Sequence, residues 1–316
     1  MRISIEERSF AVAIAPIGAL QRLLGVCFVI GLGLGAVSLQ AGAQAQERDE
    51  VARPSTRQRY WLGEDGAPLP FRNDDEIEEF LRTAEVVELE PIGIGVTNPE
   101  RVTLEKNGVR AHAVFRCFDR HWSRVRLRGQ GMMMNFRDSY RFEAAAYELA
   151  GLLGLDSVPP TVTRRVGNRN GTLQMWLYSA LMESDRAKHH MNPPDRLGWL
   201  RQWHALILFD ALIGNTDRNA GNILIDGHWK MWWVDHTRAF YRMADYGRLD
   251  DVVYVERAFW DRLRELDRPQ LDEALGSHLS DHQIEYILER RDRVLEAIEV
   301  LMAERGADAV LWEATR

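Results

Sequence analysis

Three oxygen-bearing side chains at fixed spacing constrain this chain more than any other feature. Asp217 and Asn222 lie five residues apart in the glycine-bounded run 214–222, and Asp235 follows thirteen residues later, after the apolar run 229–234. A carboxylate is a suitable proton acceptor, and carboxylate and amide oxygens are the ligands that Mg²⁺ prefers. The spacing therefore predicts Asp217 as a base and Asn222 and Asp235 as ligands of Mg²⁺ or Mn²⁺ beside a phosphate group.

Arg218, the residue after Asp217, is a further candidate for the same site. We expect it to orient the loop or to neutralise a carboxylate. The alternative is that 217–219 is only a surface turn with an ion pair, because Asn, Asp and Gly are common loop residues.

The first 45 residues have the features of an export signal. Three arginines, the last at Arg22, precede an apolar run at 23–39, and small residues at A-x-A spacing follow at 41–45. This order is typical of a secretory signal peptide. The sequence therefore predicts cleavage and a periplasmic or secreted protein. An uncleaved leader that anchors the chain in a membrane is the alternative, because the apolar run only just reaches the length of a span.

Charge and cysteine content limit the possible partners and the redox chemistry. The 316-residue chain has 40 basic and 47 acidic residues and a net charge of −7. The leader contains three Arg and two Glu, so its removal leaves 316 − 45 = 271 residues and a charge of −7 − 1 = −8. This acidic balance argues against nucleic acid as the main partner. Cys117 is the only cysteine after residue 45, which excludes an internal disulfide.

The order of predicted elements indicates an α+β, two-lobed architecture. Residues 46–72 are polar and rich in Arg, Pro and Gly, and predict a linker or disordered arm. The predicted β-rich lobe, 73–184, contains a short helix at 74–83, β-rich runs between 86 and 115, a helix at 142–153 capped by Asp138 or Ser139, and a strand at 173–180. The predicted second lobe, 185–316, has helices at 197–212 and from Ser280, with short strands at 222–225 and 229–234.

The run Phe209–Arg218, with Asn222 and Asp235, resembles the catalytic segment of atypical protein-kinase-like enzymes. It is most similar to the HipA-like kinases and the secreted Four-jointed and casein-phosphorylating kinases, and less similar to the phosphoinositide kinases. The segments 142–149 and 153–160 resemble the regulatory helix and following strand of that group. This resemblance implies a two-lobed kinase-like fold, ATP as a bound nucleotide, and Mg²⁺ or Mn²⁺ as a cofactor.

The same resemblance implies a nucleotide site in the first lobe. Glu143 matches the glutamate that pairs with the ATP-positioning lysine, and Arg116 stands where the family has that lysine. His236 also departs from the family pattern, which usually has an apolar residue or Asn after the metal-binding Asp. Gly93 and Gly95 predict a phosphate-covering loop, since glycine permits close backbone approach; an ordinary hairpin is the alternative.

The implied activity is transfer of the γ-phosphoryl group of ATP to a hydroxyl acceptor, and protein, sugar and lipid acceptors all stay open. An exported pseudokinase that binds nucleotide or protein is the alternative, because arginine does not substitute simply for lysine at such a position. A nucleotidyl transferase on the same fold is another. A zinc hydrolase built from His189, His190, His204 and His236 matches no established ligand spacing.

Overall fold

The computed structural model describes residues 61–93, 97–127, 131–215, 217–241 and 248–314. The predicted signal peptide, the alternative membrane anchor, most of the predicted linker and Gly95 lie outside these residues. No helix in the described part of the chain is long and apolar enough to cross a membrane.

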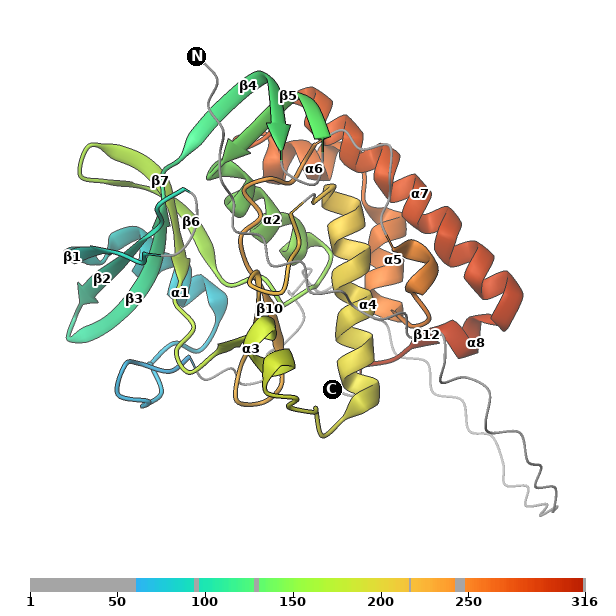
Figure 1. Cartoon of the computed structure of the whole chain (residues 1–316), viewed down its shortest axis with the longest axis horizontal. Helices are drawn as coiled ribbons and strands as arrows, with labels where there is room; N and C mark the ends of the chain where they lie inside the picture. Colours follow the sequence, from blue (N-terminus) through green and yellow to red (C-terminus); the bar gives the residue numbers. More distant parts are fainter. Residues whose placement is uncertain (1–60, 94–96, 128–130, 216, 242–247, 315–316) are drawn as a thin grey trace, which may run out of the picture. The chain divides into compact units, whose positions relative to one another are not determined.

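A five-stranded antiparallel sheet with the order β1-β2-β3-β7-β6 forms the first lobe (Figure 1). The strands are β1 (Glu85–Pro91), β2 (Glu100–Lys106), β3 (Val109–Arg116), β6 (Thr161–Val166) and β7 (Arg169–Met175). Asn107 and Gly108 join β2 to β3 with φ of 51° and 76°, as a two-residue hairpin turn of type I′ requires. The strand predicted at 173–180 ends early, at Met175, and Ser179, with φ 59°, lies in a turn.

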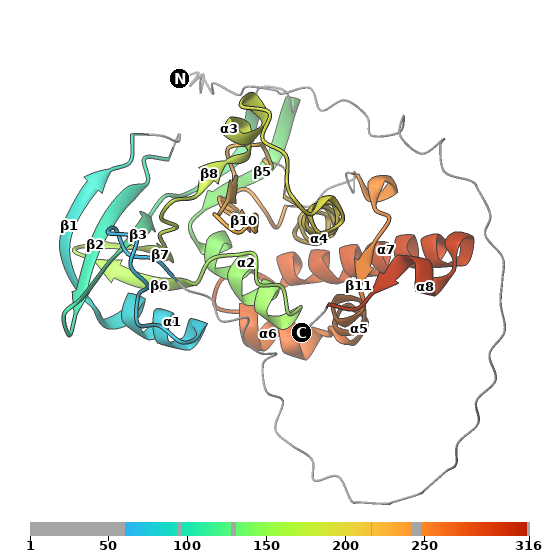
Figure 2. The same ribbon diagram turned by 90° about the horizontal axis from the view of Figure 1, so that it is seen from below.

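Helices α1 (Asp74–Thr83) and α2 (Arg141–Leu152) both contact β6 and β7 (Figure 2). The side chain of Asn73 caps α1 by accepting a hydrogen bond from the Glu76 N–H at 2.9 Å. The apolar residues of α2, among them Phe142 and Leu149, belong to the core of the second lobe. Helix α2 therefore links the sheet to the second lobe.

A separate ribbon of β4 (Asp119–Leu127) and β5 (Gly131–Ser139), which the sequence did not predict, leads from β3 to α2. The predicted cap of α2 was wrong, because Tyr140 is the N-cap residue and makes no side-chain capping bond. The carboxylate of Asp138 instead accepts a hydrogen bond from Arg238 at 2.8 Å. The hydroxyl of Ser139 accepts one from the Arg141 N–H at 3.2 Å.

The second lobe is mostly helical, and its longest helices, α4 and α7, pack against each other (Figure 1). Ser280 and Gln283 form a capping box at the start of α7. The elements are β8 (Leu181–Met182), α3 (Glu183–Lys188), α4 (Arg196–Ile213), β9 (Ile223–Ile225), β10 (Met231–Trp233), η2 (Leu249–Asp251), β11 (Val255–Glu256), α5 (Arg257–Glu265), α6 (Arg268–Leu275), α7 (Asp281–Arg305), α8 (Ala307–Val310) and β12 (Leu311–Trp312).

Two hydrophobic clusters meet at β10. Trp232 belongs to the cluster of the sheet lobe, where its ring lies 5.1 Å from that of Trp61, and Trp233 belongs to the cluster of the helical lobe. Successive side chains of a strand point to opposite faces, which explains this division. Because both rings are buried, β10 is fixed from two sides immediately before Asp235.

Candidate functional site

The loop that carries Asp217 begins where α4 ends, at Gly214. Gly214 has φ 61°, and a Cβ there would lie 2.9 Å from both the Tyr241 carbonyl oxygen and Arg290 Nη1. Both the conformation and the close packing therefore require glycine. Arg290 fixes this point by donating hydrogen bonds to the carbonyl oxygens of Leu212 at 2.6 Å and Tyr241 at 2.8 Å.

Side-chain amides hold the backbone of Asp217 in place. Its N–H donates to Asn215 Oδ1 at 3.0 Å, and its carbonyl oxygen accepts hydrogen bonds from Asn222 Nδ2 at 3.0 Å and Asn219 Nδ2 at 3.1 Å. The Asn222 amide nitrogen is thus engaged, so its Oδ1 is the atom that would bind a cation. The Asp217 side chain is 31% exposed, so a substrate can reach it.

Arg218 joins α4, the loop and the strand before Asp235. Its Nε and Nη2 pair with the Asp210 carboxylate at 2.8 and 3.0 Å, and its Nη1 donates to the carbonyl oxygens of Asn222 at 2.7 Å and Val234 at 2.9 Å. All three guanidinium nitrogens are therefore used within the protein. This is the geometry of a positioning residue rather than of a group that contacts substrate.

Asp235 follows β10 in a left-handed conformation, with φ 60°. The Val234 N–H donates to the Asn222 carbonyl oxygen at 3.2 Å, which continues the pairing of β10 with β9. Asn222 and Asp235 are therefore brought to neighbouring positions. A positive φ is uncommon for a residue other than glycine and is found at many functional sites.

Glu143 lies at the centre of a buried group that contains Arg116 and His236. Its Oε1 is 3.6 Å from Arg116 Nε and accepts a hydrogen bond from the His236 N–H at 2.8 Å; its Oε2 is 3.3 Å from His236 Nδ1. Burial alone would raise the pKa of Glu143, but Arg116 and the bonds to His236 outweigh burial and lower it to about 2. The resemblance to kinases implies that Arg116 pairs with Glu143, and the structure places the two side chains 3.6 Å apart.

Arg116 also has a donor that is available for a ligand. Its Nη1 is buried and has no hydrogen-bond partner among the described residues. A buried donor without a partner carries a desolvation cost unless a ligand satisfies it. A phosphate oxygen fits this position, because guanidinium forms strong charge-assisted hydrogen bonds with phosphate.

Arg238 is a residue of this site that the sequence did not reveal. Its Nε donates to Asp138 Oδ2 at 2.8 Å, and its Nη1 donates to Asp217 Oδ2 at 3.1 Å, with the Arg238 side chain only 10% exposed. Burial raises the pKa of Asp138, although Arg238 opposes this effect. These partners are 100 and 21 residues away in the chain, so no local pattern in the sequence indicates the contact.

The remaining predicted residues are partly described. Gly93 lies in the connection between β1 and β2. A Cβ there would meet no atom within 4 Å, but the φ of 73° favours glycine. Gly95 lies outside the described residues. No group of three or more His, Cys, Asp or Glu side chains within the described ranges is arranged to hold a metal ion. The zinc alternative therefore gains no support, and a cation at this site would depend on Asn222 as well as carboxylate.

The fold is similar to known kinase structures, although the sequence is not. No protein-family profile matches the chain, and no curated protein matches it. The structure of hydra Fam20 with sugar is 16% identical, with a TM-score of 0.59 over 77% of this chain and 93% of that chain. The Golgi casein kinase with Mn and ADP bound is 16% identical, with a TM-score of 0.54 over 75% of this chain and 78% of that chain.

At this identity the likeness establishes the fold alone. The chain has a two-lobed, α+β, protein-kinase-like fold, and the predicted fold class is confirmed.

Proposed function

We propose that this protein is a kinase-like phosphotransferase that moves the γ-phosphoryl group of ATP to a hydroxyl acceptor. One observation carries the proposal: Glu143, which pairs with Arg116, also bonds to the backbone of His236, the residue directly after Asp235. The buried carboxylate of Glu143 therefore links the candidate phosphate-binding cation to the residue next to the candidate metal ligand. Their position in a kinase-like fold supports assigning both to a single nucleotide site.

Asp217 is the proposed base. The acceptor oxygen forms a bond to the γ-phosphorus, the bond from that phosphorus to the β–γ bridging oxygen breaks, and ADP leaves. The proton of the acceptor passes to the Asp217 carboxylate. A positioned base contributes about 10²–10⁴-fold to such a rate, and the bonds from Asn215, Asn219 and Asn222 keep the backbone of Asp217 fixed.

Asn222 Oδ1 and the Asp235 carboxylate would hold Mg²⁺ or Mn²⁺, which would neutralise charge on the phosphates. Arg116 Nη1 would bind a phosphate oxygen, while Glu143 holds the rest of the guanidinium in place. Gly93 lies in the loop that would cover the phosphates. The Golgi casein kinase was solved with Mn and ADP, which supports a nucleotide with a divalent cation as the ligand.

A pseudokinase is the second candidate, because Arg238 Nη1 lies 3.1 Å from Asp217 Oδ2. An arginine that stays on this carboxylate would compete with an incoming hydroxyl. Arg116 in place of the lysine of the resembling kinases points in the same direction.

The test is turnover of ATP with Mn²⁺ or Mg²⁺ against protein, sugar and lipid hydroxyl acceptors, followed by the mass of the product. Added phosphate that disappears in Asp217→Asn, with nucleotide binding retained, supports the kinase. Added AMP would instead support nucleotidyl transfer, and unchanged turnover in Asp217→Asn would contradict the assigned base. Nucleotide binding without turnover against every acceptor would favour the pseudokinase.

We also propose that the protein is exported after cleavage of its N-terminal signal peptide. We expect the mature chain to begin after Ala45 and to be recovered from the periplasm or medium, where its N-terminal sequence can be determined. Recovery of the uncut chain in the membrane fraction would support the anchored alternative.

A further inference from the structure

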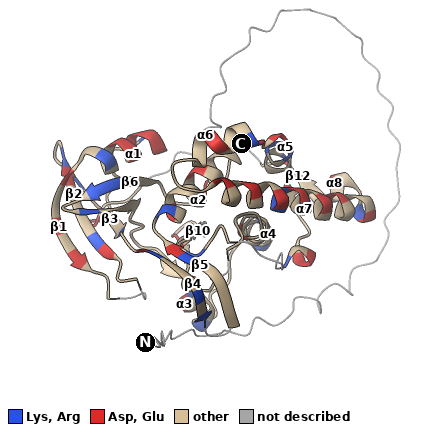
Figure 3. Ribbon diagram, turned by 90° about the horizontal axis from the view of Figure 1, so that it is seen from above, with Lys and Arg blue, Asp and Glu red and all other residues tan. Residues whose placement is uncertain are grey.

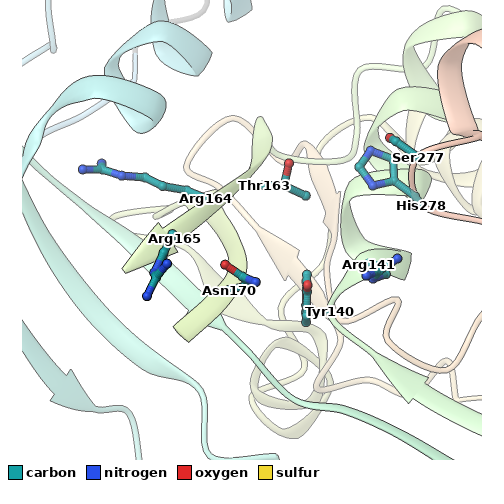
Figure 4. Close-up of a pocket in the computed structure, with 9 residues that line it drawn as sticks. Tyr140, Arg141, Thr163, Arg164, Arg165, Asn170, Ser277 and His278 are labelled. Atoms are coloured by element: carbon teal, nitrogen blue, oxygen red, sulfur yellow. The ribbon is translucent and has the colours of Figure 1, made fainter. Parts of the chain in front are cut away.

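A cavity of about 330 Å³ lies between β6, β7, the start of α2 and the turn between α6 and α7. Three arginines and a histidine line it, and no carboxylate does. Its other lining side chains are hydroxyls and an amide, apart from Gly171. Figure 4 shows Thr163, Arg165 and Asn170 on the strand side of the cavity and Arg141 and His278 on the opposite side.

The arginines of β6 have no carboxylate partner among the described residues. Arg164 extends away from the cavity in Figure 4 and donates to the carbonyl oxygens of Leu81 at 2.9 Å and Ala84 at 2.7 Å, at the end of α1. Arg165 donates from Nε to the carbonyl oxygen of Gly167 at 3.1 Å. Its Nη1 and Nη2 are therefore the forked pair that is available at the cavity.

Arg141 is only loosely paired. Its Nε is 3.8 Å from Asp119 Oδ2, whereas Arg137 binds both oxygens of that carboxylate at 2.8 Å. In a chain with a net charge of −7, cations without close carboxylates are unexpected. Figure 3 shows the contrast, with basic residues on β6 and acidic residues along α7.

The pKa shifts of Arg164 and His278 agree with a cavity that no carboxylate lines. Burial lowers the pKa of Arg164, and no carboxylate opposes this effect. Burial and the nearby charge of Arg141 lower the pKa of His278. His278 therefore favours its neutral form, in which one ring nitrogen donates and the other accepts a hydrogen bond.

We propose that this cavity binds the phosphate monoester of a small hydroxylated molecule, such as a sugar phosphate. The Arg165 fork and the Arg141 guanidinium suit a phosphate group. The side chains of Thr163 and Asn170 suit the hydroxyls of the same ligand. The volume lies at the lower end of the range for small-molecule pockets, which is appropriate for a monosaccharide with one phosphate.

None of the residues that line the cavity is assigned to the candidate nucleotide site, and the proposal does not depend on phosphotransferase activity. It does lie close to α2, because Arg141 precedes Glu143 by two residues. A bound ligand would therefore contact the first turn of the helix that carries Glu143.

Isothermal titration of the full chain tests the proposal, with glucose 6-phosphate, inorganic phosphate and glucose as probes and no nucleotide or divalent cation present. We expect glucose 6-phosphate to bind one to one, inorganic phosphate to bind more weakly, and glucose not to bind. Arg165→Ala is expected to weaken glucose 6-phosphate at least about tenfold, through the loss of charge-assisted hydrogen bonds. Arg165 is exposed, so this variant is expected to fold, and an unchanged Tm checks that it does.

Two variants serve as controls. Arg293→Ala removes an exposed arginine on α7 that pairs with Glu296, and Arg116→Gln removes the cation of the nucleotide site; neither is expected to change glucose 6-phosphate binding. The proposal is overturned if glucose 6-phosphate does not bind, if Arg165→Ala leaves its affinity unchanged, or if Arg116→Gln abolishes binding in a folded protein. Inorganic phosphate that binds as tightly as glucose 6-phosphate would overturn the claim that hydroxyls are recognised.

Discussion

The candidate catalytic centre and the basic cavity use arginine in opposite ways. In the centre, Arg116, Arg218 and Arg238 each bind a carboxylate that is buried or partly buried. In the cavity, Arg164 and Arg165 bind only backbone carbonyl oxygens. The paired arginines are held by carboxylates, and of their nitrogens only Arg116 Nη1 is assigned to a ligand, whereas both Nη atoms of Arg165 are available.

This difference predicts where substitution affects stability and where it affects only binding. A buried ion pair adds little net stability, but removal of one partner leaves an uncompensated charge and is strongly destabilising. An exposed arginine with no carboxylate partner among the described residues, as at Arg165, carries no such penalty. Substitution of a paired arginine is therefore expected to lower the free energy of unfolding, whereas substitution of Arg165 is expected to affect only ligand binding.

The largest expected effect is on turnover. Asp217→Asn keeps the size of the side chain and its backbone bonds but removes the base, so kcat is expected to fall about 10²–10⁴-fold with little change in ATP affinity. A coupled ADP-release assay measures the first quantity and titration the second. Retention of wild-type kcat would show that Asp217 is not the base.

The second-largest effect is expected on the free energy of unfolding, when the Arg116–Glu143 pair is broken. Arg116→Gln leaves a fully buried carboxylate without its cation, and is expected to cost about 3–5 kcal/mol of unfolding free energy. Arg116→Lys, which keeps the charge, is the matched control and should recover most of this loss. Equal stability of the Gln variant and the wild type in denaturant titrations would mean that the pair is not buried as described.

The Arg116–Glu143 pair is also expected to make the free energy of unfolding depend on pH. Because the pKa of Glu143 is lowered from 4.5 to about 2 in the folded protein, its contribution to stability is complete above pH 4.5 and is lost as the pH falls towards 2. In Arg116→Gln the pKa of Glu143 is expected to be less strongly lowered, so the stability lost between pH 4.5 and 2 should be smaller. Parallel pH profiles for the two proteins would contradict this.

A smaller effect is expected at Arg238. Arg238→Gln removes a bond to Asp217 and one to Asp138, and is expected to cost about 1–3 kcal/mol of stability and to lower kcat about tenfold, because the base is less well oriented. KM for ATP should not change. An increase in turnover would instead identify Arg238 as an inhibitory partner of the base and strengthen the pseudokinase alternative for the wild type.

The smallest effect is expected in the cavity. Arg165→Ala should change the unfolding free energy by less than about 0.5 kcal/mol, in contrast to Arg116→Gln. A large loss of stability in this variant would show that Arg165 is structural, and the contrast between the two regions would fail.

The parts of the site that the sequence predicted are those that depend on short chain segments. Asp217 and Asn222 share one loop, and Asp235 follows the strand that pairs with the residues after Asn222, so their proximity follows from a hairpin. The pairing of Arg116 with Glu143 came from the resemblance to kinases, because spacing alone does not bring a strand end to a helix.

The parts that it missed depend on distant segments. Arg238 meets Asp138 across 100 residues, and this contact removes Asp138 from its predicted role as a cap of α2. The β4–β5 ribbon was missed because its strands mix arginine with Trp and Met and have no clear alternation. The basic cavity combines residues from three separate segments, and no local pattern marks it.

Titration of the purified protein with ATP, with and without Mn²⁺, tests the central claim most directly. The account predicts binding that requires Mn²⁺, that weakens at least about tenfold in Asp235→Ala and Arg116→Gln, and that is unchanged in Arg165→Ala. Absence of binding with and without Mn²⁺, or equal binding by Asp235→Ala, would contradict the assignment of a kinase-type nucleotide site.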